Sequence, residues 1–159
     1  MPLLQRVIKQ LKEKNPTVNF LDLSNSGLFD EDIDVLVPLL KDNAYITTLK
    51  LHRNNLSASG TKQLASLTTI HTLILSENDI GDDGVELLAK NKNIKTLNIS
   101  NNNLHDKGAQ ILAEYAEQTT LIFDGGWISP QWRNAVEEHI ASNRQQQGDE
   151  KNPSNQCRF

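Results

Sequence analysis

Histidine and serine side chains recur at matching positions of this sequence, which is a pairing that nucleophilic hydrolases use. His52 and Ser76 are 24 residues apart and are predicted to lie side by side on neighbouring strands. The only carboxylate in the same column of positions is Asp124, and three strand spacings place it about 14 Å from His52. At that distance it cannot orient the imidazole. We therefore predict no catalytic residue and no enzyme activity.

The other histidines and the acidic clusters do not match a metal site. No two of the four histidines have a ligand-pair spacing, and the single cysteine, Cys157, cannot form a thiolate cluster. Acidic residues gather at 30–34 and 79–86, but without the spacing of a calcium loop. They fall where helices are predicted to begin, and carboxylates there cap backbone N–H groups and favour the helix dipole. We expect no metal and no cofactor.

A repeat of 24 residues positions these side chains. The segments LKLHRNNL, LILSENDI, LNISNNNL and LIFDGGWI align at 49–56, 73–80, 97–104 and 121–128. LDLSNSGL at 21–28 matches them after a step of 28 residues. Each unit reads L-x-L-x-x-N-x-L, in which the alternating apolar residues indicate a short strand. Such a repeat stacks supersecondary units on one continuous core.

Asparagine and glycine recur at fixed places after each predicted strand. The asparagines are Asn54, Asn78 and Asn102. They lie where the chain must turn, and a column of amide side chains can satisfy the backbone groups buried there. The glycines of the three middle units are Gly60, Gly84 and Gly108. We interpret them as allowing a close approach of helix to strand.

This pattern resembles the leucine-rich repeat family in its ribonuclease-inhibitor-like variety, over about residues 18–128. The resemblance implies an α/β solenoid of about five strand–helix units, with a parallel sheet on the concave face and helices on the convex face. It favours a binding module over an enzyme, because stacked repeats present extended surfaces. The departures are the short units, Asp32 in place of a glycine, and a fifth unit without the usual helix pattern.

Helical caps are predicted at both ends of the solenoid. Residues 1–17 carry apolar side chains at helical spacing, which indicates an N-terminal capping helix. Four basic residues in this segment leave a membrane-surface or partner-binding helix as the alternative. Residues 129–143 begin with Ser129 and Pro130, a favourable helix start, and are predicted to be the C-terminal capping helix. Residues 144–159 are polar and without periodicity, which predicts a disordered tail.

Charge and composition exclude several classes of partner. The repeats at 18–128 hold 15 acidic and 8 basic residues, a net charge of −7, whereas residues 1–17 carry +3. An acidic body repels phosphate backbones, so we expect no nucleic acid partner. No stretch of about 18 apolar residues predicts a membrane span. The single cysteine and the lack of an apolar leader favour a cytoplasmic location.

The outward face of the strands is the predicted binding surface, because every second side chain of a strand points away from the core. We assign the contacts with a protein partner to non-repeating residues of this face and its loops. Three form an expected basic spot (Lys50, His52 and Arg53), and Ile74 and Ile122 are expected to be exposed apolar residues. The complete predicted set is Phe20, Asp22, Lys50, His52, Arg53, Ile74, Glu77, Asn98, Ile122, Asp124 and Trp127.

Three binding roles fit these features. Small leucine-rich repeat chains rich in Asn and Lys resemble effectors that intracellular bacteria such as Legionella deliver into host cells. The polar tail that ends in Phe159 looks like a type IV secretion signal, which implies a host protein as partner and the host cytoplasm as location. The alternatives are a substrate-recruiting adaptor of a ubiquitin ligase and a protein inhibitor of an enzyme. Five capped units predict a monomer.

Overall fold

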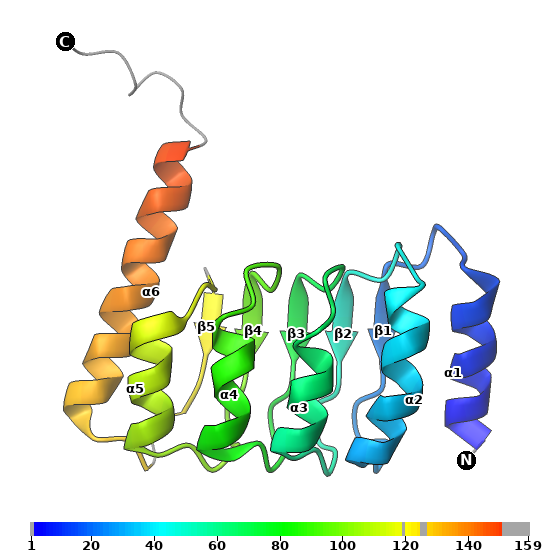
Figure 1. Ribbon diagram of the computed structural model, residues 1–159, viewed down its shortest axis with the longest axis horizontal. Coiled ribbons are helices and arrows are strands. Elements are labelled where there is room, and N and C mark those ends of the chain that lie inside the picture. The colour runs from blue at the N-terminus through cyan, green and yellow to red at the C-terminus, as the bar shows by residue number, and fades with distance from the viewer. Residues whose placement is uncertain (1, 119, 125–126, 151–159) are drawn as a thin grey trace.

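The computed structural model describes residues 2–118, 120–124 and 127–150 (Figure 1). Helices and strands alternate along this chain. In chain order they are α1 Pro2–Glu13, β1 Phe20–Asp22, α2 Asp30–Lys41, β2 Thr48–Lys50, α3 Ala58–Leu64, β3 Thr72–Ile74, α4 Gly81–Ala89, β4 Thr96–Asn98, α5 Asp106–Tyr115, β5 Thr120–Ile122 and α6 Pro130–Glu150. After α1, five strand–helix units follow one another, which confirms the predicted solenoid.

The five strands form one parallel sheet in the order β1-β2-β3-β4-β5. The register aligns equivalent residues of neighbouring units, so that Leu49 pairs with Leu73 and Leu73 with Leu97. The helices form a second layer in which each helix packs against the next, from α1 to α6. Figure 1 shows this helix layer covering one face of the sheet. We call the opposite face, which carries no helix in the described chain, the sheet face.

The two apolar residues of each strand segment form the core beneath the strands, and they are buried in the first four units. Leu49, Leu73 and Leu97 are at most 1% exposed, and they stack from strand to strand. Burial of apolar surface is the main favourable term in folding, and no single unit of this size could bury its own leucines. The alternation of the sequence is therefore explained by one continuous core shared by all units.

The asparagine column stabilises the turns that follow the strands, as predicted. The side-chain N–H groups of Asn102 donate to the carbonyl of Ile99 at 3.0 Å and to that of Leu75 in the preceding unit at 2.9 Å. Its carbonyl oxygen accepts the N–H of Ile80 at 3.3 Å. The two earlier asparagines of the column repeat this pattern. Each amide thus links its own turn to the previous unit.

The repeated glycines bring helix against helix, so the predicted contact of helix with strand is wrong. A Cβ on Gly108 of α5 would lie 2.5 Å from a carboxylate oxygen of Asp82, at the start of α4. The same oxygen of Asp82 accepts the N–H of His105, just before α5, at 2.8 Å. Acidic residues at the helix starts therefore accept backbone N–H groups, as predicted; Asp82 does so across units, whereas Asp32 accepts the N–H of Phe29 within its own unit. Glycine leaves room for that carboxylate.

The two ends of the solenoid are covered by α1 and α6. Val7 and Leu11 of α1 are buried against the first unit, and Val136 and Ile140 of α6 are buried at the other end. Residues 144–150 belong to α6, so the prediction of a disordered tail from residue 144 is wrong for them. Arginine and glutamine, which begin this segment, are good helix formers.

The remainder of the predicted tail, residues 151–159, lies outside the described residues. Among the helices described above, none is long and apolar enough to cross a membrane.

Candidate protein-binding face

The strand register sorts the outward side chains of the sheet face into columns. The first column begins with Phe20 and continues with threonine in the other four strands. The second column holds Asp22, Lys50, Ile74, Asn98 and Ile122. Neighbours within a column lie about 4.8 Å apart, which is close enough for side chains of adjacent strands to pair.

Carboxylates oppose the basic side chains of the predicted basic spot, which leaves little net positive charge there. Lys50 Nζ lies 3.7 Å from Asp22 Oδ2. Arg53 Nε lies 2.6 Å from Glu77 Oε2, and His52 Nε2 lies 3.8 Å from Glu77 Oε1. The two fixed positive charges thus face two negative charges. The partners are 24 and 28 residues away in sequence, and only the register brings them together.

Asp22 is held in its charged form by its surroundings. A hydrogen bond from the Ser24 side chain is the main cause that lowers the pKa of Asp22, followed by the Ser24 backbone N–H at 3.0 Å. Burial acts in the opposite direction, and the charge of Lys50 and its hydrogen bond each add a smaller lowering. The Asp22 carboxylate therefore remains ionised at neutral pH.

Arg53 and Glu77 sit on backbone that most residue types avoid. Both have φ of 55°, in the left-handed region, as do Asn25 and Asn101 (φ of 55° and 54°) at the equivalent positions of the first and fourth units. Only glycine adopts this conformation without cost, and asparagine tolerates it better than most residues. The turn that follows each strand requires this left-handed conformation. It thereby holds the two charged side chains at the border of the sheet face where the strands end.

His52 and Ser76 do lie side by side, with Nδ1 of the imidazole 2.9 Å from the serine Oγ. The carboxylate nearest the other ring nitrogen, Nε2, is that of Glu77. The spacing of the residues in the sequence did not predict this contact. Ser76, however, is only 7% exposed, and the 2.6 Å contact with Arg53 already engages Glu77. Ser76 therefore offers little exposed surface to a substrate. These side chains form a polar link between β2 and β3 rather than a nucleophilic site.

Solvent reaches the apolar side chains at the two ends of the sheet face. Phe20 on β1 is 54% exposed and Ile122 on β5 is 46% exposed. Ile74, on the central strand, is half-buried by its neighbours, so the expectation that it is exposed holds only in part. Asn98 is also half-buried, and its side-chain oxygen accepts the hydroxyl of Ser100 at 2.8 Å.

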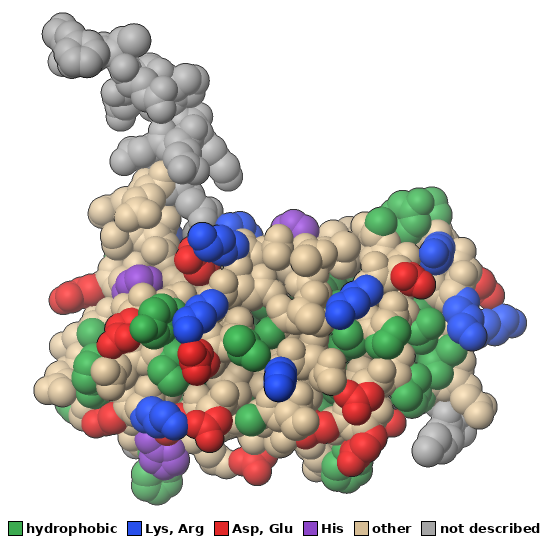
Figure 2. All heavy atoms as spheres, viewed as in Figure 1, with side chains coloured by type: hydrophobic (Ala, Val, Ile, Leu, Met, Phe, Trp, Pro, Cys, Tyr) green, Lys and Arg blue, Asp and Glu red, His purple; other side chains and the backbone are tan. Residues whose placement is uncertain are grey.

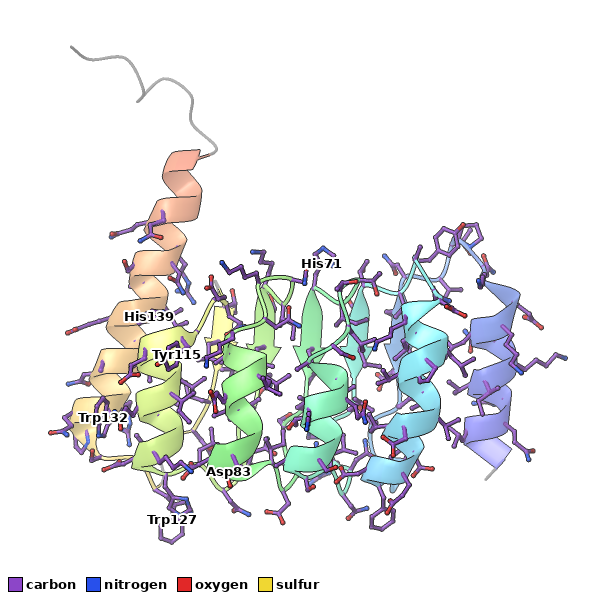
Figure 3. The ribbon with its side chains drawn as sticks, viewed as in Figure 1. His71, Asp83, Tyr115, Trp127, Trp132 and His139 are labelled. Atoms are coloured by element: carbon purple, nitrogen blue, oxygen red, sulfur yellow. The ribbon has the colours of Figure 1, made fainter. Side chains whose placement is uncertain are left out.

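Trp127 does not belong to the sheet face. Its ring is 74% exposed and lies 6.3 Å from the ring of His105, just before α5. Figure 3 shows the indole pointing away from the body at the border where the helices begin, on the same side as Asp83. Asp124 is half-buried in the turn after β5. The structure thus gathers most of the predicted set on one face and separates Trp127 from it.

The helix face shows positive and negative side chains interspersed (Figure 2). Acidic side chains gather along the lower border of that view, where the helices begin. There Asp83 lies 2.6 Å from Lys107, and this hydrogen bond lowers the pKa of Asp83 and raises that of Lys107. Several of these acids are therefore engaged in contacts between units.

Comparison with known proteins agrees with this architecture. A family model described as "Leucine Rich repeat" matches residues 66–89 and 90–113, which are two consecutive units. The chain therefore contains leucine-rich repeats. Repeats of this family are typical of protein–protein interaction. No curated protein matches the sequence.

Two solved structures share the fold of this leucine-rich repeat protein over nearly its whole length. One is titled "Leiomodin-1 Actin-Binding Site 2 (ABS2)", with a TM-score of 0.74, 18% identity and coverage of 91% of each chain. The other is a tropomodulin C-terminal domain from Caenorhabditis elegans, with a TM-score of 0.71 and 14% identity. The second match covers 93% of this chain and 97% of the tropomodulin domain.

Proposed function

We propose that this leucine-rich repeat protein is a non-catalytic module that binds a partner protein through the sheet face and its adjoining loops. The observation that carries the proposal is the exposure of Ile122: this large apolar side chain is 46% exposed on a face of paired polar groups. Apolar residues surrounded by polar contacts are typical anchors of interfaces. Phe20 offers a second anchor at the opposite end of the sheet.

Charge pairing on the sheet face limits the kind of partner. Since Asp22 opposes Lys50 and Glu77 opposes Arg53, the face has no strong field of one sign. A partner would gain little from long-range electrostatic steering, so we expect association to depend weakly on salt. The five rungs offer fifteen outward positions, fewer than the roughly 20–30 residues per side of a standard interface. The loops would have to contribute for tight binding.

Replacing Ile122 by Glu is expected to abolish partner binding. A carboxylate in place of this apolar anchor would be desolvated in the contact without a partner, which costs more than tenfold in affinity. The measurement is quantitative affinity purification from a eukaryotic lysate, followed by mass spectrometry. Leu87→Glu is the matched control, because Leu87 is also 46% exposed but lies on α4 in the helix layer.

A partner retained by Ile122→Glu and lost by Leu87→Glu would place binding on the helix face and contradict the proposal. Circular dichroism of both variants checks that the fold is intact. Actin is the first candidate to look for among the recovered proteins, because a structure titled as an actin-binding site matches this chain over 91% of both chains. Likeness at 18% identity supports the fold alone, so the experiment decides.

A role as a bacterial effector is the narrower proposal. It rests on composition, namely the Asn- and Lys-rich repeats and the polar segment that ends in Phe159. Removing residues 144–159 is expected to abolish delivery of a reporter fusion through a type IV system into host cells, without changing its amount in the bacterium. Unchanged delivery would remove the secretion signal from the proposal. A ubiquitin-ligase adaptor would instead co-purify a ligase component, and an enzyme inhibitor would co-purify its target.

A further inference from the structure

The outer edge of β5 ends a hydrogen-bond ladder that every earlier unit continues. In those units the second apolar residue of the strand segment donates its N–H to a carbonyl of the next unit, each time at 2.8 Å. The four donors are Leu23, Leu51, Leu75 and Ile99. Phe123 is the fifth member of the series, and backbone groups alternate in direction, so its N–H points away from β4. In the described part of the chain no sixth strand lies beside β5.

The apolar side chains of the last unit are less covered than their counterparts. Leu97 and Ile99 of the fourth unit are 0% exposed, whereas Leu121 and Phe123 at the same positions of the fifth are only half-buried. A hollow of about 150 Å³ opens beside them, and Ile140 of α6 lines it as well. Incompletely buried apolar side chains beside an unpaired strand edge form the kind of surface that an added strand covers.

The position of α6 leaves space for a single strand. Each of α2 to α5 leads from the end of one strand to the start of the next, and α6 takes the same place after β5, packed against α5 (Figure 1). α6 therefore overhangs the position of a sixth strand. A second copy of this chain paired edge to edge would bring its own helix layer against α6. An isolated extended segment would not.

Two side chains of opposite charge on α6 line the same hollow, and they determine the order of charged residues in a segment that binds there. Glu137 and Arg144 are both exposed and lie on either side of Ile140, about 10.5 Å apart along the helix axis. Figure 1 shows that α6 runs opposite to β5. From the order of residues along the two elements, we infer that Arg144 is nearer the start of β5 and that Glu137 is nearer its end. A segment parallel to β5 would place an acidic residue near Arg144 and a later basic residue near Glu137.

We propose that the edge of β5 beneath α6 binds an extended segment of a partner protein as a sixth parallel strand. The segment would carry an acidic residue, two apolar residues and a basic residue at alternate positions, all on one face. The apolar pair would continue the column of core leucines, and the charged residues would meet Arg144 and Glu137. Residues 151–159 of this chain contain no Asp or Glu and lack this pattern. The site is separate from the sheet face.

The test uses the whole chain and the synthetic peptide acetyl-Thr-Glu-Thr-Leu-Thr-Leu-Thr-Lys-Thr-amide. Amide hydrogen exchange is followed residue by residue by NMR, and saturating peptide is expected to slow exchange of the Phe123 N–H at least ~10-fold. A peptide with Pro in place of the central Thr is expected to have no effect. It lacks the N–H that the carbonyl of Leu121 would accept.

Direction is tested by exchanging charges on both sides. The double variant Glu137→Arg and Arg144→Glu is expected to prefer the peptide in which Glu and Lys have exchanged places, by about fivefold in Kd, as expected for two exposed ion pairs. Both replaced side chains are exposed, so the fold is expected to be unchanged.

Four results would overturn the proposal. The first is unchanged exchange at Phe123 with saturating peptide, and the second is equal slowing by the Pro-containing peptide. The third is a preference that the charge exchange does not reverse. The fourth is slow exchange of the Phe123 N–H before any peptide is added. If removing residues 151–159 restores fast exchange, that segment of the chain itself occupies the edge of β5. If the protection instead increases with protein concentration, a second copy of the chain occupies the edge.

Discussion

Leu97→Ala is expected to lower the free energy of unfolding by about 4 kcal/mol, the largest effect of any single truncation proposed for this chain. Leu97 is 0% exposed and lies on β4 between the leucines of β3 and β5, so neighbours on both sides would have to move to close the cavity. Chemical denaturation with urea, followed by circular dichroism, measures the change.

Leu121→Ala is the matched control for that prediction. Leu121 holds the same position one unit later, yet it is half-buried because no described strand covers its far side. We expect a loss of about 1.5 kcal/mol, since part of its apolar surface is already hydrated. Equal losses at both positions would contradict the conclusion that the last unit is open at its edge.

Asn102→Ala is expected to lower the free energy of unfolding by about 3 kcal/mol. The side chain is 0% exposed, and its removal would leave the carbonyls of Leu75 and Ile99 and the N–H of Ile80 without this partner. A buried polar group that loses its partner costs about 1 kcal/mol or more. The same urea denaturation measures the change.

Asn93→Ala makes the same chemical change at an exposed position. We expect a change below about 0.5 kcal/mol there, as for most surface substitutions. If Asn102→Ala proves as mild as this control, water replaces the lost amide and the asparagine column does not stabilise the turns as described. The pair thus separates the effect of burial from the effect of residue type.

The repeat architecture could be predicted because local spacing determines it. The L-x-L pattern specifies which strand side chains are buried, and a period of 24 residues requires that each unit meets the next in register. The asparagine column was predictable for the same reason, since a sharp turn inside a stack has buried backbone groups that need partners. The helix beyond residue 143 was missed, because a polar segment can extend a helix that tertiary contacts have already started.

Contacts across units could not be predicted with the same success. A glycine at position 108 is compatible with a close approach of either a strand or a neighbouring helix, so the sequence does not distinguish the two. The packing of α5 on α4 places the Asp82 carboxylate beside Gly108. The sequence did not show that the basic side chains of the predicted spot have acidic neighbours. Strand register, rather than distance in the sequence, brings Asp22 beside Lys50. Trp127 was predicted to lie in a loop adjoining the sheet face, because the alternation of strand residues does not encode the direction of that loop.

The sequence by itself determined the stack of units, the identity of the core and the lack of a spacing for catalysis or metal binding, because each follows from periodicity within one unit. Tertiary structure alone decided which surface is exposed and how it is charged. It paired Arg53 with Glu77 and buried Ser76, and within the described residues it placed no strand beside the outer edge of β5. Those outcomes depend on which side chains meet across units, and long-range contacts of that kind arise only when the units stack.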